Sequence, residues 1–517
     1  MLAHIYGARC VGIDAVKVTV EIDIDRGIGI HLVGLADVAV KESLLRTTTA
    51  LQSMGYRIPG KKIVINLAPA DLHKKGSGYD LPIALGIIAA SGQRVLPGLS
   101  SYIVMGELGL DGSIREIAGA LPFTELAVAE GFKGVILPLR SALEAVDFKD
   151  TGVYGVRTLE DVIRILSETE DCSDLLVWNS AEFGLTAQGN QSPSETDTVD
   201  FADIIGQEGA KRGIEIAASG GHNVIMVGAP GSGKSSLAKA MAGILPPMTM
   251  EESIVTSKIY SIAGKGGSRI GLVRQRPFRA PHYSASLAAI VGGGGGDAVM
   301  PGEVSLAQNG VLFLDEVGQM PKSVIEALRG PLEDRAVTVS RLRAKVVYPA
   351  SFMLVAASNP CPCGYWGEGD RCNCTPAQRL GYLGRISGPV QDRIDLHLWL
   401  HSVPSCRILQ GHKAEPSSAV ALRVMKAREI QKRRFESESI NCNAEMGNKL
   451  IEKYCPLSPE CMDTMRRLMD SAGFSMRAYF RIIKVARTIA DLEGAADINA
   501  GHLSEAAGYR FLDRRMP

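Results

Sequence analysis

The strongest constraint on the fold is a glycine-rich segment that follows a short apolar run. Residues 223–227 (NVIMV) have the pattern of a buried strand, the next eight read GAPGSGKS (228–235), and a helical run, SLAKAMAGIL, follows. This is GxxxxGK[ST] between a strand and a helix, the context that the phosphate-binding loop requires. The glycines let backbone N–H groups converge on phosphate oxygens, and the helix N-terminus adds its positive end. The alternative is a glycine turn that binds nothing.

The loop predicts particular contacts to a nucleoside triphosphate with Mg²⁺. Lys234 is expected to reach the β- and γ-phosphates, and the Ser235 hydroxyl is expected to bind Mg²⁺. The predicted cofactor-binding residues, with one acid from further along the chain, are Gly228, Ala229, Pro230, Gly231, Ser232, Gly233, Lys234, Ser235, Ser236 and Asp315.

Two carboxylates end the apolar strand VLFL at 311–314. Asp315 can hold Mg²⁺, and Glu316 is placed to act as the general base on the attacking water. Acidic residues at strand ends are common and alone would indicate little. The interpretation rests on the position of this pair downstream of a phosphate loop.

A further apolar run, FMLVAAS (352–358), ends in Asn359. An amide at this point could orient the lytic water beside the γ-phosphate. The alternative is a turn-forming asparagine before Pro360.

The chain of 517 residues is too long for one core, so two or three domains are expected. Residues 1–180 read as mixed α and β, 181–200 as a polar linker, 201–403 as alternating strands and helices, and 404–517 as helical. The predicted fold class is α/β: a parallel sheet flanked by helices, preceded by an α+β domain and followed by a helical lid.

The charge is unevenly divided. Residues 1–200 hold 17 Lys and Arg against 26 Asp and Glu, a net charge of −9, which leaves +9 for residues 201–517. An anionic polymer would therefore meet the C-terminal two-thirds. No segment approaches ~18 consecutive apolar residues, and no secretion signal is visible, so a cytoplasmic protein without a membrane span is expected.

Residues 336–348 (AVTVSRLRAKVVY) alternate like a hairpin with bases near its tip. Arg341, Arg343 and Lys345 have a period of two, so they share one side of a strand and could follow a phosphate backbone. The alternative is a charged, solvated edge strand. Another basic stretch, 426–434, is interpreted as the solvated face of a helix.

Ten cysteines in a long chain without a secretion signal argue against a disulfide framework. Cys361, Cys363, Cys372 and Cys374 form two CxC pairs that could close a tetrahedral structural zinc site. Four reduced thiols on a loop are the alternative.

Four segments occur in the order of a known family: the phosphate loop, PGEVSLAQNGVLFLDE (301–316), AASNPCPCGY (356–365) and ISGPVQDRIDL (386–396). With FSMRAYFRIIKVARTIADL (474–492), they resemble the magnesium-chelatase-like AAA+ proteins, and most closely the ComM/YifB group. The resemblance implies an ATP- and Mg²⁺-dependent motor that forms rings, usually homohexamers. It implies DNA, branched or single-stranded, as the partner, and branch migration during integration of transforming DNA.

Two arginines receive roles from this resemblance. Arg393, in DRIDL, matches the finger that enters the neighbouring subunit's site, and Arg477, in FSMRAYFR, matches the sensor-2 arginine that contacts the γ-phosphate. For each the alternative is a structural ion pair, and Arg481 lies one turn beyond Arg477 on the same helix face.

The N-terminal region resembles the Lon-protease-like fold. Its turn KGSGYD (75–80) places Gly78 where the nucleophilic serine belongs, with Ser77 one position away, and residues 106–115 offer no matching lysine. A non-proteolytic platform that handles DNA or stabilises a ring is therefore expected. The competing functions are an ATP-driven protein-remodelling motor, like the magnesium-chelatase motor subunit, and, less favoured, an ATP-dependent protease.

Overall fold

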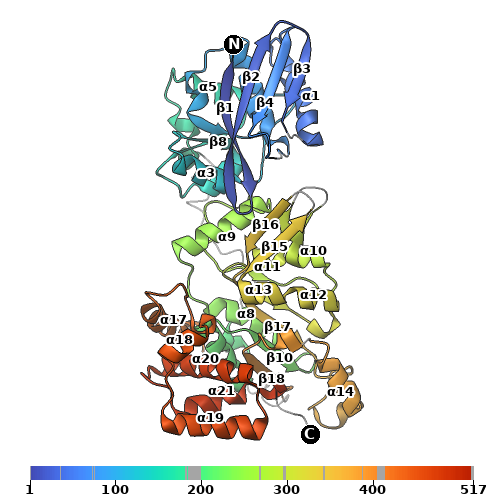
Figure 1. Cartoon of the computed structure of the whole chain (residues 1–517), viewed down its shortest axis with the longest axis vertical. Helices are drawn as coiled ribbons and strands as arrows, with labels where there is room; N and C mark the ends of the chain where they lie inside the picture. The colour runs from blue at the N-terminus through green and yellow to red at the C-terminus, as the bar shows by residue number, and fades with distance from the viewer. Residues whose placement is uncertain are drawn as a thin grey trace.

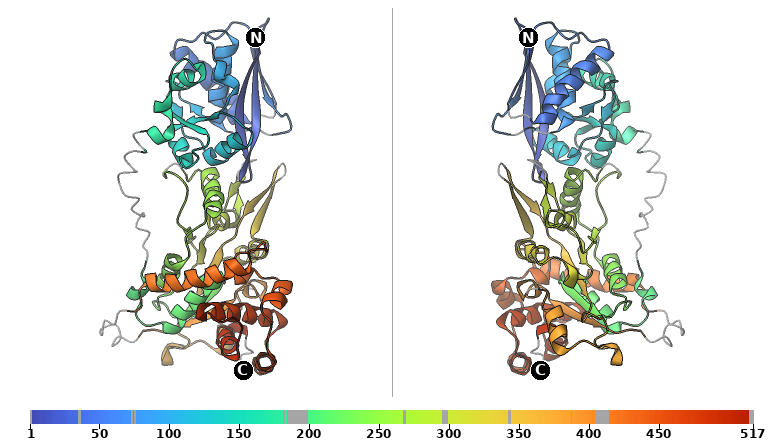
Figure 2. Two further views of the ribbon diagram at one scale, coloured as in Figure 1. Left: turned by 90° about the vertical axis from the view of Figure 1, so that its left-hand side faces the viewer. Right: turned by 90° about the vertical axis from the view of Figure 1, so that its right-hand side faces the viewer.

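The computed structural model describes residues 2–34, 37–72, 74, 76–180, 183, 199–266, 269–294, 299–341, 344–386, 388–403 and 414–513. In the elongated molecule the N-terminal part lies at one end of the long axis, and the C-terminal helical part lies towards the other end, beside the central part (Figure 1; Figure 2). The predicted linker, 181–200, lies almost wholly outside the described residues. No helix of the described segments is long and apolar enough to cross a membrane.

The N-terminal part is built on a mixed seven-stranded sheet of order β3-β4-β2-β1-β5-β8-β9. Its strands are β1 (Ala3–Val11), β2 (Asp14–Asp25), β3 (Gly29–Val33), β4 (Lys62–Ala68), β5 (Tyr102–Val104), β8 (Gly134–Pro138) and β9 (Gly152–Val156), with a small pair β6 (Glu107–Leu108) and β7 (Ile114–Arg115). Its helices are α1 (Val38–Ser53), α2 (Asp80–Ala90), α3 (Ala120–Ala129), α4 (Leu139–Ala142) and α5 (Leu159–Ser167).

The sequence pattern explains how this sheet and its helices pack. Along β2 the alternate residues Val18, Val20 and Ile22 are fully buried, as expected for a strand with one face on a core. Helix α2 is buried on nearly all sides and packs on β1 and β2. Gly86 permits the close approach, because a Cβ there would lie 2.4 Å from Cδ1 of Ile22. The side chain of Asp37 caps α1 by accepting from the Val40 N–H.

The central part contains a five-stranded sheet of order β11-β14-β17-β10-β18, in which all neighbouring strands are parallel. The strands are β10 (Val224–Gly228), β11 (Phe278–Arg279), β14 (Val311–Leu314), β17 (Met353–Ser358) and β18 (Leu396–Leu400). The helices are α7 (Glu208–Gly220), α8 (Lys234–Ile244), α9 (Met250–Ile262), α10 (Leu287–Val291), α11 (Glu303–Leu306), α12 (Lys322–Ala327), α13 (Arg329–Asp334), α14 (Pro376–Leu383) and α15 (Gly388–Gln391). Two hairpins project from it, β12 (Gly292–Gly293) with β13 (Met300–Pro301), and β15 (Ala336–Arg341) with β16 (Ala344–Pro349).

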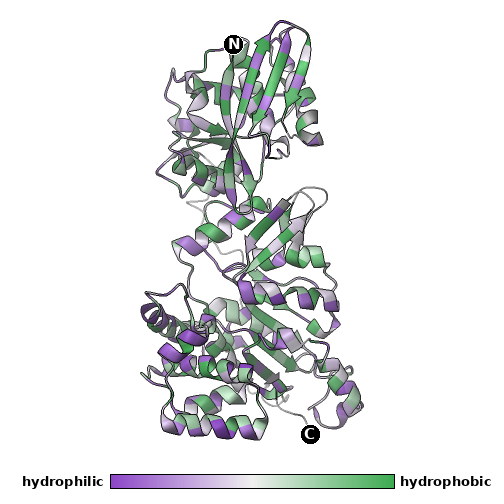
Figure 3. Ribbon diagram, viewed as in Figure 1, coloured by the Kyte–Doolittle hydropathy of each residue, from purple (hydrophilic) through white to green (hydrophobic). Residues whose placement is uncertain are grey.

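The C-terminal part is helical and consists of α17 (Ser417–Arg434), α18 (Asn448–Tyr454), α19 (Pro459–Ala472), α20 (Met476–Glu493) and α21 (Ala500–Gly508). The Ser475 side chain caps α20 by accepting from the Ala478 N–H. Helices α17 and α20 pack on α7, so one core joins this part to one face of the central sheet. Figure 3 shows that α17 is largely hydrophilic and the central strands are hydrophobic. The predicted fold class, a parallel sheet flanked by helices with a C-terminal helical region, is confirmed.

Helix α9 carries the contact between the N-terminal and central parts. Lys258, on α9, is 7% exposed and bonds Asp14 at 2.6 Å and Glu125 at 2.5 Å across the junction. The turn between β1 and β2 reaches the β15–β16 hairpin, since a Cβ on Gly12 would lie 3.2 Å from the Val347 carbonyl oxygen. The hairpin therefore lies beside the N-terminal part (Figure 1).

Candidate nucleotide site

The glycine-rich loop joins β10 to α8 at the carboxyl edge of the central sheet. Gly231 (φ 77°) and Gly233 (φ 92°) adopt left-handed backbone conformations, which favour glycine. Apart from the adjoining residues, no atom in the described part of the chain lies within 4 Å of a Cβ built on either glycine. The loop is therefore open in front of these glycines, and the start of α8 adds the positive end of a helix dipole.

Lys234 is 9% exposed and folds back over this loop. Its ammonium donates to the carbonyl oxygens of Gly228 at 2.6 Å and Ala229 at 2.9 Å, and to Oδ1 of Asn359 at 3.2 Å. Burial lowers the pKa of Lys234. Phosphate oxygens bound at this point would give the partly desolvated Lys234 ammonium an anionic partner. The residues present therefore fit a nucleoside triphosphate.

The acidic pair lies beside the loop because β14 ends at the same edge. The Ser235 hydroxyl donates to Oδ2 of Asp315 at 3.2 Å, and a hydroxyl beside a carboxylate is a donor set suited to Mg²⁺. Glu316 directly follows, with φ 48° and ψ 41°. A left-handed glutamate costs of the order of 1–3 kcal/mol and is characteristic of functional sites. Its residue type alone gives no signal of this conformation.

Asn359 follows β17, the strand between β10 and β14. Parallel pairing sets Ser358 opposite Val227, so Asn359 lies at the edge that holds the phosphate loop. Its contact with Lys234 joins the predicted sensor to the predicted phosphate-binding lysine. The structure thus brings together Lys234, Ser235, Asp315 and Asn359, and places Glu316 next to them.

Gln207 is a site residue that the sequence reasoning missed. It also has a left-handed conformation (φ 61°), and its Nε2 donates to the Ser232 carbonyl at 3.1 Å and to the His401 carbonyl at 2.6 Å. It therefore ties the phosphate loop to the end of β18. The only sequence signal was the glycine-flanked segment IIGQEG, at residues 204–209.

The two predicted arginines lie together in a different place. A cleft of about 430 Å³ is lined by both Arg393 and Arg477, and none of its described lining residues belongs to the phosphate loop. Arg393 pairs with Glu333, and Arg477, with its side chain 73% exposed, pairs with Asp392. The cleft also contains Lys484, whose pKa burial lowers to about 8.

Helix α20 is held to the sheet by an ion pair near this cleft. Arg481 contacts Oδ1 of Asp395 at 2.6 Å, and Asp395 is 1% exposed. Arg477 and Arg481 thus reach different carboxylates, Asp392 and Asp395, although they share a helix face. The ion pair of Arg481 is therefore with a buried carboxylate and is structural, whereas the Arg477 side chain is largely exposed.

Of the predicted DNA-contacting residues, Arg341 ends β15 and Lys345 lies on β16. The prediction that the three bases share one side of a single strand is therefore wrong, because a hairpin separates these two residues. The strands pair in antiparallel fashion, with Ser340 opposite Lys345. Lys345 is exposed. The side chain of Arg341 and all of Arg343 lie outside the described residues.

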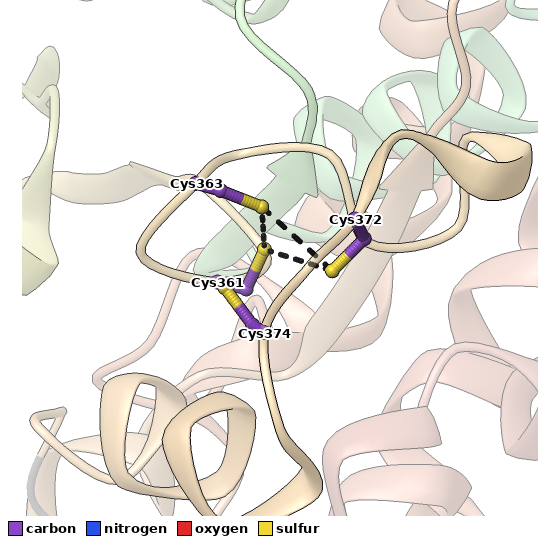
Figure 4. A group of neighbouring side chains, drawn as sticks. All are labelled: Cys361, Cys363, Cys372 and Cys374. Atoms are coloured by element: carbon purple, nitrogen blue, oxygen red, sulfur yellow. Dashed lines mark hydrogen bonds between the residues drawn. The ribbon is translucent and has the colours of Figure 1, made fainter.

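The four clustered cysteines converge on one point (Figure 4). Their sulfur atoms all lie within 4.8 Å of one another. The separations are 3.3 Å for Cys361–Cys363, 3.8 Å for Cys361–Cys372 and 3.7 Å for Cys363–Cys372. The two CxC pairs therefore form one cluster.

In the turn that resembles the Lon active site (residues 75–80), no hydrogen bond between a serine and a lysine is found among the described residues. Ser77 donates to Glu107, and the fully buried Lys74 donates to the Pro69 carbonyl. The Lon-like resemblance of this part stays a prediction.

A phosphate loop, an acidic pair and a polar strand end on a five-stranded parallel sheet define an ATPase of the AAA+ class. Over their whole lengths two bacterial proteins are similar to this chain. The protein YifB of Salmonella typhimurium is 42% identical over 518 residues, covering 100% of this chain and 98% of that protein. Competence protein ComM of Haemophilus influenzae is 40% identical over 520 residues, with the same coverage. The chain belongs to the YifB/ComM family of magnesium-chelatase-like AAA+ ATPases.

Three family models of magnesium-chelatase proteins also match. Magnesium chelatase, subunit ChlI, matches residues 200–408, the ChlI C-terminal model matches 414–510, and subunit ChlI of Mg-chelatase matches 20–141. The magnesium-chelatase 67 kDa subunit of Chlorobaculum parvum is 30% identical over 164 residues, which is 31% of this chain and 23% of that protein. This more distant likeness covers one segment only.

Proposed function

We propose that this chain is the subunit of a cytoplasmic homohexameric ring that hydrolyses ATP to move on DNA and shift its branch points. Branched or single-stranded DNA is the partner in this proposal. The cofactors are ATP with Mg²⁺ at the phosphate loop and one structural zinc ion at the four cysteines.

The contacts at the sheet edge support ATP hydrolysis. When bound, MgATP supplies the phosphoryl group that is transferred to water. Lys234 and the loop N–H groups would hold the phosphates, while Ser235 and Asp315 would hold the metal. Glu316 would take a proton from the attacking water, and Asn359 would orient that water.

The position of the arginine cleft supports a ring. Arg393 and Arg477 line one cleft that contains no described phosphate-loop residue. Guanidinium groups that stabilise charge on a γ-phosphoryl must touch it, and such groups contribute ~10³–10⁵ in rate. A neighbouring copy would bring its nucleotide to this cleft, which would displace Glu333 and Asp392 from the two arginines.

The observation that carries the DNA proposal is the β15–β16 hairpin with exposed Lys345 near its tip. Its bases suit contacts to a phosphate backbone, which carry no sequence information. One full-length relative is named a competence protein. Branch migration exchanges one base pair for another, whereas plain unwinding loses ~1.4 kcal/mol of stacking per step. Hydrolysis would therefore supply direction and speed.

A four-strand junction assay with and without ATP tests the proposal. Wild-type protein should move the junction only with ATP. Changing Arg341, Arg343 and Lys345 together to Ala should abolish DNA-stimulated ATPase, keep basal hydrolysis and flatten the salt dependence of binding, because fewer counterions are released. The matched control changes Lys426, Lys432 and Arg433 to Ala, three exposed bases on α17.

Two outcomes would contradict the proposal at different points. If the hairpin variant moves junctions at the wild-type rate, the hairpin is not the DNA grip. If wild-type protein moves no junction with ATP present, a protein-remodelling motor becomes the better reading. The segmental likeness to a magnesium-chelatase subunit favours that second candidate.

A further inference from the structure

We infer that the four-cysteine loop is a metal-locked brace of the nucleotide site, so that zinc occupancy sets the rate of ATP hydrolysis. This inference rests on the proposed function, because the rate concerned is that of the proposed hydrolysis.

The sulfur spacing fits a tetrahedral metal ion and excludes a disulfide. Zinc–thiolate bonds of about 2.3 Å in a tetrahedron require sulfur atoms about 3.8 Å apart. The separations of 3.3, 3.7 and 3.8 Å lie close to this value. A disulfide would instead bring two sulfurs to about 2.05 Å.

The segment that the cysteines enclose has little structure of its own. Between residues 361 and 374 the only helix is a single turn, Gly369–Arg371. Its backbone hydrogen bonds include Gly364 N–H to the Cys361 carbonyl and Glu368 N–H to the Tyr365 carbonyl. A metal ion that joins its two ends would remove much of the conformational freedom that so irregular a loop otherwise has.

One side of this loop lies against the phosphate loop. Gly364 has φ 84°, and a Cβ built on it would lie 2.9 Å from Cδ of Pro230. Cys361 is fully buried and stands two residues after Asn359, whose amide contacts Lys234. The first cysteine is therefore close along the chain to the predicted sensor.

The other side of the loop lies against the end of β18. Trp366 packs edge-on against Trp399, with ring centroids 5.3 Å apart, and a Cβ on Gly367 would lie 2.9 Å from Trp399. The Ser402 N–H donates to Glu368 at 2.8 Å. The loop thus bridges β10, β17 and β18 at the edge where the phosphates would bind.

These contacts assign the cysteines a positioning role. They touch neither the phosphates nor the attacking water, but they fix the segment that follows Asn359 and the residue that packs on Pro230. Without metal the brace should loosen, and the amide should lose its alignment. The phosphate loop itself would remain held by β10 and α8, so nucleotide binding should change less than turnover.

Metal content gives the first test. Wild-type protein purified without chelator should hold one zinc per chain by elemental analysis, and a value below about 0.2 with reduced thiols would overturn the metal site. Changing Cys372 and Cys374 together to Ser should remove the zinc. Cys374→His should keep it, because imidazole is also a zinc ligand.

Kinetics give the second test. In the double serine variant kcat for ATP should fall about tenfold or more while KM changes less than about threefold, since a small misplacement of a catalytic group affects turnover strongly. Cys374→His should retain wild-type kcat. Cys172→Ser is the matched control, a cysteine that is 8% exposed and outside the loop, where a hydroxyl can keep the hydrogen bond to the Glu170 carbonyl.

Tryptophan emission gives a readout that does not depend on activity. In a Trp178→Phe background the remaining tryptophans are Trp366 and Trp399, so a red shift on zinc loss reports that their contact opens. An unchanged spectrum, or wild-type kcat in zinc-free protein, would overturn the brace and leave the proposed function intact. Absence of hydrolysis by wild-type protein would overturn the proposed function, while zinc content and emission would still decide the state of the loop.

Discussion

Removal of the Arg481 guanidinium should loosen the attachment of α20 to the central sheet. Arg481 contacts Asp395, a carboxylate that is 1% exposed. Burial alone would raise the pKa of Asp395, but Arg481 and then His222 hold it well below its usual range. Arg481→Met keeps the apolar stem and leaves the buried carboxylate without its cation.

The magnitude follows from the contacts that remain. Breaking a buried ion pair by removing one partner costs ~3–5 kcal/mol. Asp395 would still accept from His222 at 3.2 Å and from the Asn223 N–H at 3.3 Å, so the lower end applies. At about 2 °C per kcal/mol for a large domain, a loss of about 3 kcal/mol lowers Tm by about 6 °C.

Scanning calorimetry is the appropriate assay, because a multidomain chain does not unfold in two states. The transition to follow is the one that MgATP raises, since a ligand stabilises the part that binds it. The matched control is Arg433→Met, which removes an arginine with a side chain 77% exposed and paired with Glu429. A surface pair of this kind contributes ~0–1 kcal/mol.

A second substitution separates loss of the ion pair from loss of packing. Arg481→Met combined with Asp395→Asn removes the unpaired charge, so it should recover at least half of the lost Tm. The pH dependence has a fixed sign. A lowered pKa in the folded state contributes stability above the unfolded value of about 3.9, and that contribution is lost as pH falls. In Arg481→Met this contribution is absent, so the difference in Tm from wild type should stay constant down to about pH 5 and narrow only as pH falls below about 4. A Tm loss below about 2 °C, or a double variant no better than the single one, would refute the reasoning.

Four further substitutions address the catalytic roles and the acid limit of stability. Glu316→Gln should bind ATP with near-wild-type affinity by calorimetry yet hydrolyse it ~10²-fold or more slowly, because the general base is lost while the phosphate loop is intact. Lys234→Ala should instead lose ATP binding. Wild-type turnover in Glu316→Gln would show that another residue is the general base. Arg393→Ala should bind ATP but hydrolyse it ~10³-fold more slowly. Mixing Arg393→Ala protein with Glu316→Gln protein should restore part of the ATPase activity. No recovery at any mixing ratio would mean that Arg393 acts within its own subunit. Burial lowers the pKa of His222, so below about pH 6.5 the unfolded chain binds a proton that the folded chain does not. The Tm of wild-type protein should therefore fall more steeply with decreasing pH than the Tm of His222→Asn. Equal slopes of Tm against pH would show that His222 does not contribute to acid destabilisation.

Local patterns were sufficient for the elements that hold the nucleotide site. Strand β10, the loop and the start of α8 follow from apolar runs and glycine placement, and Ser475 and Asp37 mark helix starts because short polar side chains cap helices. Parallel strands share one carboxyl edge, so the motifs after β10, β14 and β17 were expected to meet there.

Features set by distant residues could not be read in this way. Nothing local to Glu316 or Gln207 shows a left-handed backbone, since surrounding contacts impose it. The order β3-β4-β2-β1-β5-β8-β9 depends on pairings between remote segments. The shared cleft of Arg393 and Arg477 depends on how α20 packs, which periodicity does not define.

That shared cleft leads to a dependence of hydrolysis on protein concentration. If both arginines act on a neighbour's nucleotide, an isolated chain has phosphate loop, metal ligands and base but no cation to offset charge on the transferred group. Specific ATPase activity should then rise with protein concentration and reach a plateau where sedimentation shows complete rings. Dilution below the assembly concentration should lower turnover by the ~10³–10⁵ that such cations contribute. Arg393→Ala protein should show the low rate at every concentration while still assembling. A wild-type rate that is constant per chain from monomer to ring would show that each site is complete within one chain, and would exclude the neighbour's arginines from catalysis.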